Sequence, residues 1–211
     1  GDLGTSFQTG RPVLEDIVKF FPATIELATL ALIIAIVVGI PLGVLSAVYR
    51  NSPIDHFSRV VSLIGVSMPV FWLGLVLMLI FYFKLGWFPE PGRLDIMLIE
   101  PNRITGILLL DSLIARDWEV MWDAMKHMFL PATVLGLFGL AGIARIVRSS
   151  MLDVLSQEYI KTARIKGLNE FLVLTRHALR NALVPAVTVI GLTYGGLLEG
   201  SVLTETIFSW P

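Results

Sequence analysis

Side chains able to do chemistry are few in this 211-residue chain, and they do not gather into a catalytic pattern. The three histidines, His56, His127 and His177, stand alone in or beside polar segments, without the spacing of a metal site. Ser67 lacks the second glycine of a nucleophile elbow, no glycine precedes a lysine as in a phosphate-binding loop, and cysteine is absent. We therefore predict no catalytic residue, no metal site and no bound cofactor, and we do not expect this chain to be an enzyme.

Two carboxylates stand near the ends of long apolar stretches, where an ionisable group is costly to bury and is a functional candidate. They are Glu26 and Glu199, and each could instead reach interfacial water. Trp72 is the one tryptophan inside an apolar stretch, where lining a solute pathway and packing against lipid or core are the alternatives. The sequence leaves these alternatives open.

The most informative polar stretch runs from Met151 to Leu179, which is too polar to span a bilayer and too patterned to be a slack loop. Apolar side chains recur there at helical spacing: Leu152, Leu155, Tyr159 and Ala163. The other face of that helix is charged: Glu158, Lys161 and Arg164. Gly167 ends the helix, and Asn169 is a good cap for a second helix from Glu170. We predict a helix-turn-helix elbow at the membrane surface, of a kind that suits a partner protein.

The elements around this elbow are predicted to cross a membrane. Hydrophobic residues make up 55% of the chain and charged residues 16%, against about 25% charged in an ordinary soluble domain. Four stretches contain no Asp, Glu, Lys or Arg: Leu27 to Tyr49, Val60 to Phe83, Met128 to Ala144 and Asn181 to Leu198. A bilayer core is crossed by about 20 apolar helical residues. The prediction is an all-α polytopic membrane helix bundle, one domain over 1–211, with spans near 22–49, 60–83, 128–148 and 181–203.

The charges of the connecting segments predict which side each one occupies. Segments 50–59 and 145–180 carry more Lys and Arg than Asp and Glu, whereas the loop 84–127 is acidic. Because Lys and Arg accumulate on the cytoplasmic side, 50–59 and 149–180 are expected to be cytoplasmic and 84–127 external. The chain then begins and ends outside, which suggests an earlier transmembrane helix that this sequence lacks. In the outer loop, Ile104 to Leu110 is expected to pack on the bundle, with a re-entrant segment as the alternative.

Small residues recur at helix-packing spacing, in three pairs separated by three residues: Gly39 with Gly43, Gly191 with Gly195, and Gly196 with Gly200. Such spacing lets helix backbones approach closely in lipid. Packing within the chain is favoured over a dimerisation motif.

The first helix of the elbow and its turn resemble the EAA loop of ABC importer permeases. The residues that match are Glu158-Tyr159-Ile160-Lys161-Thr162-Ala163-Arg164-Ile165-Lys166-Gly167-Leu168. Of the general motif, Glu-Ala-Ala followed after three residues by Gly, only Ala163 and Gly167 match. Departures from it are similar to what dipeptide/oligopeptide permeases have: Lys161, Thr162, Arg180 and the continuation from Arg176 to Pro185.

Both ends of the chain are also similar to the peptide-permease family, at Gly1 to Ser6 and at Glu199 to Pro211. The family's subunits have six helices, so the resemblance implies that the first and the sixth are missing from this sequence. It further implies an inner-membrane protein of a bacterial or archaeal cell, imported solutes such as dipeptides or oligopeptides, and relatives that transport nickel, glutathione or sugars. The residues alone do not identify the solute.

The resemblance implies several partners: a second related permease, an external solute-binding protein, and two cytoplasmic ATPases that bind ATP and Mg. Membrane lipid is a further partner, and the net charge of −1 gives no reason to expect nucleic acid. The residues expected to couple to the ATPases are Glu158, Tyr159, Lys161, Thr162, Ala163, Arg164, Lys166, Gly167 and Leu168.

Two other classes of protein share these features. A secondary transporter or channel would also have several spans and positive inner loops, but it would usually place ionisable groups at mid-membrane, where these spans are nearly empty of them. A non-transporting scaffold could use the elbow only to recruit a cytoplasmic partner.

Overall fold

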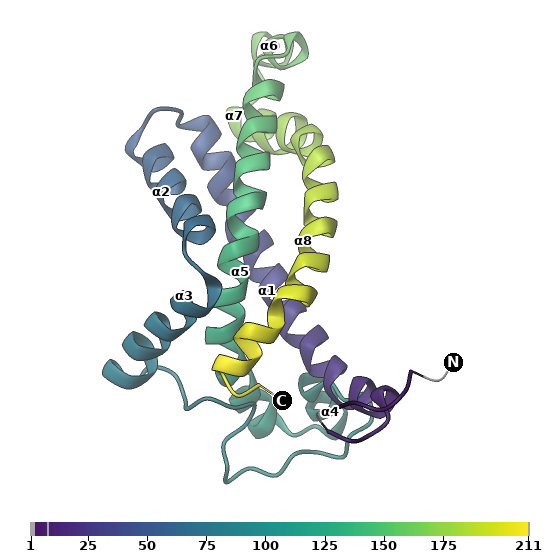
Figure 1. Cartoon of the computed structure of the whole chain (residues 1–211). Coiled ribbons are helices and arrows are strands. Elements are labelled where there is room, and N and C mark those ends of the chain that lie inside the picture. The colour runs from purple at the N-terminus through teal and green to yellow at the C-terminus, as the bar shows by residue number, and fades with distance from the viewer. Residues whose placement is uncertain (1–2, 8, 211) are drawn as a thin grey trace. The chain divides into compact units, whose positions relative to one another are not determined.

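The computed structural model describes residues 3–7 and 9–210 (Figure 1). Gly1, Asp2 and Pro211, which belong to the two terminal stretches singled out above, lie outside the described residues. The described part of the chain is helical and holds no strand, and one isolated antiparallel bridge joins Thr5 to Pro12. The predicted all-α class is confirmed.

Within the described residues, three helical runs are long and apolar enough to cross a membrane. They are α1 (Val13–Val48), α5 (Trp118–Leu155) and the run Glu170–Ile207, which comprises α7 (Glu170–Leu172), the π-helix η2 (Val173–Leu179) and α8 (Arg180–Ile207). α1 and α5 extend well beyond the predicted spans. Charged residues end a span but do not end a helix, and acidic residues in a first turn, such as Glu15 and Asp16, even favour one.

The predicted span 60–83 is divided between several helices: α2 (Pro53–Ser67), α3 (Val70–Leu77) and the π-helix η1 (Met78–Lys84). The break falls at Met68, whose backbone is extended with φ −93 and ψ 134. Pro69 explains it, because the proline ring disfavours helical backbone in the residue before it and removes a donor. A fourth span exists only if both pieces cross together, so the count of four stays a prediction.

The chain divides into two compact units. Unit 1 comprises Gly1–Leu30, Val70–Leu135 and Leu198–Pro211, and unit 2 comprises Ala31–Pro69 and Gly136–Leu197. The long helices α1, α5 and α8 each contribute residues to both units.

In unit 2 the core forms where α1 approaches α5. A Cβ placed on Gly43 would lie 2.7 Å from the backbone oxygen of Ala144, so only glycine allows this approach. Gly39 packs on the same helix, as expected for packing within the chain. The glycines of α8 make no such contact with the described residues, because a Cβ at Gly191, Gly195, Gly196 or Gly200 meets no described heavy atom within 4 Å, and for them the expectation stays a prediction.

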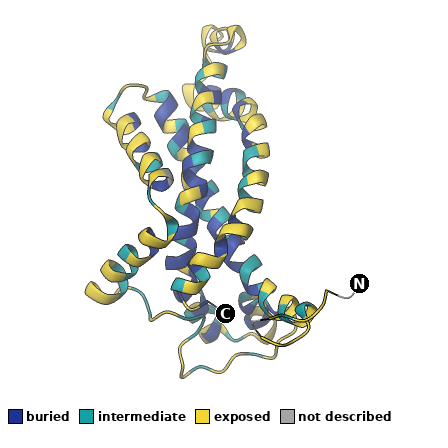
Figure 2. Ribbon diagram, in the orientation of Figure 1, coloured by how far each residue is buried: buried dark blue, intermediate teal, exposed yellow. Residues whose placement is uncertain are grey.

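The long helices differ sharply in burial. Figure 2 shows buried positions along much of α5 and few along α8. In the most apolar stretch of α5, 67% of the residues are buried, against 17% in that of the run Glu170–Ile207. α5 therefore forms the core, whereas α8 presents a wide apolar face.

In unit 1 the outer segment is built around α4 (Leu108–Ala115) and the loop before it. Leu108 is buried with Val120 and Ala124 of α5, while Ile104 is two-thirds exposed. A second cluster in this unit joins Leu130 and Phe208. The expected packing of the patch from Ile104 to Leu110 therefore holds for its C-terminal half.

Candidate coupling site

The predicted elbow is present in unit 2, where α6 (Glu158–Ile165) lies at the end of α5 (Figure 1). α6 ends in a Schellman motif: the N–H of Gly167 donates to the carbonyl of Arg164 at 2.9 Å, and the N–H of Leu168 donates to that of Ala163 at 3.3 Å. This ending needs a left-handed residue, and Gly167 supplies it with φ +76. The side chain of Asn169 then accepts from the N–H of Phe171 and starts α7.

The buried side of the elbow differs from the predicted stripe. Ala163 is buried, but Tyr159 is 43% exposed and the fully buried residue is Ile160. α5 ends at Leu155 and α6 begins a new helix at Glu158. Because the helix is interrupted, the spacing of apolar residues counted from α5 does not predict which side of α6 is buried. Ile160 and Ala163 belong to the core cluster that includes Val173 of η2, so α6 folds back onto the next helix.

Tyr159 has a different part in the elbow, because its hydroxyl oxygen accepts a hydrogen bond from the side-chain amide of Asn181 at 2.8 Å. This contact joins α6 to the first turn of α8, and it crosses the turn at Gly167. Ala163 and Tyr159 therefore hold the elbow together, whereas the other predicted residues lie on its surface.

The surface of the elbow is charged and apolar together. Of the nine predicted coupling residues only Ala163 is buried. Besides Tyr159, seven others are exposed: Glu158, Lys161, Thr162, Arg164, Lys166, Gly167 and Leu168. Arg164 forms two hydrogen bonds, of 2.7 and 3.1 Å, with the carboxylate of Glu170 across the turn. Ile165 is 85% exposed and Phe171 71% exposed, so the tip presents large apolar side chains as well.

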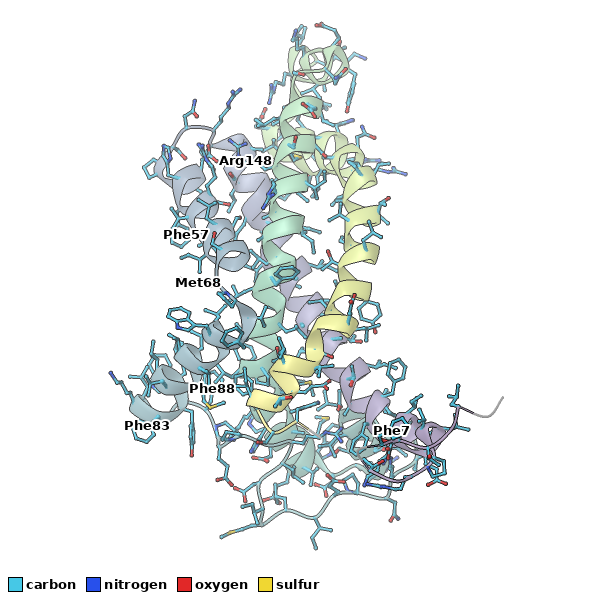
Figure 3. All side chains as sticks on the ribbon, viewed as in Figure 1. Phe7, Phe57, Met68, Phe83, Phe88 and Arg148 are labelled. Atoms are coloured by element: carbon cyan, nitrogen blue, oxygen red, sulfur yellow. The ribbon has the colours of Figure 1, made fainter. Side chains whose placement is uncertain are left out.

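A buried ionic network, which the sequence analysis missed, lies in unit 2 beside the short loop after α1. Asp55 is fully buried and accepts from Arg148 at 2.9 and 3.1 Å and from Arg59 at 2.7 Å. Ser46 of α1 and the N–H of Asn51 also donate to it. Figure 3 labels Arg148, whose side chain lies between α2 and α5. The sequence held one signal of this network: Asp55 is the single acidic residue of the basic segment 50–59, and Arg59 follows it by four residues.

A second network fastens the outer loop within unit 1. Glu26 of α1 is only 6% exposed, and it accepts from Arg93 at 2.8 Å and from the N–H of Leu109 at 2.7 Å. Arg93 in turn lies over the ring of Trp210, and the indole N–H of that residue donates to the carbonyl of Ala23. The carboxylate of Glu26 is therefore buried and paired in this structure, which favours a structural contact over one with interfacial water.

The remaining candidates are not brought together. Glu199 is exposed, Trp72 is 47% exposed, and His127 is buried with its Nδ1 atom 3.1 Å from the carboxylate of Asp123. Over residues 3–7 and 9–210, no group of three or more His, Cys, Asp or Glu side chains is placed to hold a metal ion.

Comparison with known proteins defines the class of this chain. The family described as "Binding-protein-dependent transport system inner membrane component" matches residues 39–211. The chain belongs to this family, and it is a multi-pass component of the inner membrane. The family that the sequence resembles is therefore confirmed, and the part played by the elbow residues stays a prediction.

Individual relatives are about half identical to this chain in sequence. Over its whole length the chain is 51% identical to the probable D,D-dipeptide transport system permease protein DdpB of Escherichia coli K12, of which it covers 62%. It is also 46% identical to the dipeptide permease protein DppB of Alkalihalophilus pseudofirmus, covering 63% of it, and 50% identical to the di/tripeptide permease protein DppB of Pseudomonas aeruginosa, covering 62%. The chain thus spans under two thirds of the length of these relatives.

Proposed function

We propose that this chain is the main part of a permease subunit of an ATP-driven importer, which takes up dipeptides or short oligopeptides. It forms half of the translocation pathway and couples to cytoplasmic ATPases through the elbow of α6 and α7. The proposal depends most on the elbow. Its turn is closed by a Schellman motif at Gly167, and the charged side chains of α6 are exposed to a partner.

The physical case for coupling is the stiffness of this segment. ATP-driven closure of two ATPases can move membrane helices only through a contact that does not yield. α6 is tied to η2 by buried Ile160 and to α8 by the bond between Tyr159 and Asn181, so a force on α6 is passed to a long apolar helix. The exposed Ile165 and Phe171 give a partner an apolar surface to bury.

Several partners follow from this proposal. The family description names a binding protein, which would deliver the solute on the external side. ATP and Mg would be bound by the ATPases, and this chain would hold no cofactor. A second permease would complete the pathway, and the apolar face of α8 suits it, because Val184, Val187 and Leu192 are each about two-thirds exposed or more beside open glycines.

Peptides are the proposed solute because the names of all three relatives refer to di- or tripeptides or D,D-dipeptides. Specificity within that class would depend largely on the binding protein.

The test is ATP-driven uptake by the full-length protein with Gly167→Asp. We expect the variant to reach the membrane and to lose uptake, because a side chain at φ +76 opposes the turn. Gly86→Asp is the matched control, because Gly86 also has positive φ (+61) with open space around it. Gly86 lies in the outer loop, so uptake by this variant should persist. Undiminished uptake by Gly167→Asp would contradict the coupling role.

The energy source and the copurifying proteins separate the competing classes. Uptake driven by an ion gradient without ATP would favour a secondary transporter or channel, and partner binding without uptake would favour a scaffold. Affinity purification of the tagged full-length subunit from mild detergent should recover a second permease and ATPases, and Gly167→Asp should lose the ATPases.

A further inference from the structure

A pocket of about 620 Å³ lies between α2 and α5 in unit 2. Each helix contributes four residues at the same spacing, i, i+1, i+4 and i+5, which places them on one face: Ser58, Arg59, Ser62 and Leu63 from α2, and Ala144, Arg145, Arg148 and Ser149 from α5. Neither the coupling elbow nor the comparisons account for this pocket.

Both ends of the pocket are held by contacts that fix its shape. At one end a Cβ on Gly65 would lie 2.6 Å from the backbone oxygen of Leu137, so α2 and α5 touch there. At the other end Asp55 of α2 is bound by Arg148 of α5. The pocket is therefore part of the folded unit and does not have to form when a ligand arrives.

The charge of the pocket is strongly positive. Three arginines line it and no carboxylate does. Asp55, behind the lining, is bound by Arg59 and Arg148, whose side chains remain 46% and 25% exposed. Arg145 is exposed and forms no ion pair with any described residue. Counting Asp55, two positive charges are left over, and guanidinium groups bind phosphate oxygens in a bidentate manner.

The two apolar residues of the pocket lie on the side away from the short loop, and Arg145 lies beside them. Arg59 and Arg148 lie toward the short loop between α1 and α2, where both bind Asp55. Leu63 and Ala144 lie one helical turn farther from that loop on their helices. Leu63 is 62% exposed and continues an apolar face of α2 that includes Phe57 and Val60. A ligand that combines an anionic head with apolar chains fits this lining.

We propose that this pocket binds an anionic phospholipid of the leaflet on the side of the short loop, with its phosphate on Arg59 and Arg145 and an acyl chain along Leu63. Basic pockets between membrane helices bind such head groups because the low-dielectric surroundings strengthen the ionic contact. The phosphate of the bound lipid would offset one of the two positive charges that remain after Asp55 is counted, and its chain would fill the groove between α2 and α5.

The test is a lipid titration of the full-length permease in detergent, followed by native mass spectrometry. Dioleoyl phosphatidylglycerol is the probe, and dioleoyl phosphatidylcholine is the lipid control. We expect Arg145→Gln to weaken phosphatidylglycerol binding by about tenfold, because one charge-assisted contact is lost while the bonds to Asp55 stay intact. Arg145→Lys should retain part of the affinity.

Arg176→Gln is the matched control, since it removes an exposed arginine from the same basic side but outside the pocket. Equal losses in both variants would overturn the site, as would equal binding of phosphatidylcholine. Displacement of the lipid by excess inorganic phosphate would assign the pocket to a free anion and overturn the lipid. If Arg145→Gln instead released a second permease with lipid binding unchanged, the pocket would be a subunit interface. Uptake measured in parallel tests the proposed function separately.

Discussion

Two polar segments of unit 2 both contain an arginine bound to a carboxylate, but they differ completely in exposure. Asp55, bound by Arg148 beside the short loop, is fully buried. In the elbow, the side chains of Arg164 and Glu170 are 43% and 55% exposed. A buried pair is costly to break, whereas an exposed pair contributes little to stability. The short loop is therefore fixed by its charges, while the charges of the elbow remain available to a partner.

The largest expected effect on stability comes from removing the charge of the buried carboxylate. Asp55→Asn leaves Arg59 and Arg148 without a counter-charge, and we expect a loss of about 3 kcal/mol in the free energy of unfolding, since both arginines keep some exposure. Denaturant unfolding of the full-length protein in micelles measures it. Asp153→Asn, which changes an exposed acid on α5, should leave stability unchanged. Equal stability of the two variants would show that the network is not structural.

A third buried carboxylate, Asp111 of unit 1, extends the comparison to a group that forms no ion pair with any described residue. Asp111 is 3% exposed, and it accepts from the N–H and hydroxyl of Thr105, each at 2.7 Å, and from the N–H of Gly106 at 3.0 Å. Burial alone would raise the pKa of Asp111, but these hydrogen bonds outweigh it and hold the pKa below the ordinary value of 3.8. The folded state therefore favours the ionised form.

The sign of the pH dependence follows from that direction. With a folded pKa below the unfolded one, the stabilisation is complete above about pH 4 and is lost as pH falls through the folded value. Asp111→Asn should cost about 1–3 kcal/mol at neutral pH and flatten the acid dependence of thermal unfolding. Glu100→Gln, at an exposed site of the same loop, should keep the wild-type profile. If Asp111→Asn kept the wild-type acid dependence of thermal unfolding, Asp111 would not be the source of that dependence.

At the elbow, Gly167→Ala tests the turn without adding charge. A Cβ there meets nothing within 4 Å, so the cost is the left-handed backbone alone, roughly 1–2 kcal/mol. Because the strain is local, hydrogen exchange should quicken in α6 and α7 while the core of α5 stays protected. Gly195→Ala is the control, since it lies in helical backbone with open space and should be neutral or slightly stabilising. Identical exchange in the two variants would contradict the importance of the turn.

The smallest expected effect concerns the exposed pair. Glu170→Gln should lower stability by about 0.2–1 kcal/mol, and less at high salt, because solvent screens the pair. Thermal unfolding at two ionic strengths measures it. A loss as large as that of Asp55→Asn would remove the distinction between the two segments.

The elbow shows how far the sequence leads. Gly167 and Asn169 marked the end of one helix and the start of the next correctly, because both act through their own backbone and nearest neighbours. The apolar stripe failed between Leu155 and Tyr159, because a break of two residues shifts the phase of a helix, and a count along the chain does not detect it. The coupling role of the surface residues stays a prediction.

The predicted membrane spans also divide into features that the sequence predicts and features that it does not. Length and absence of charge located the helices that are long and apolar enough to cross a membrane, but the charge-free run from Val60 to Phe83 concealed a break at Pro69. Asp55, Arg59 and Arg148 were counted only as loop charges, although Arg148 lies 93 residues from its partner along the chain. Nothing local pairs residues at that separation.

What the sequence by itself determined are the properties that depend on local patterns: an all-α membrane protein, the elbow, and the family it belongs to. Only the tertiary structure decided which charges are buried, that Glu26 is bound by Arg93, and that three arginines of two helices line one pocket. The physical reason is that helix formation and apolarity depend on neighbours in sequence, whereas the burial and pairing of a charge depend on which helices come to lie side by side.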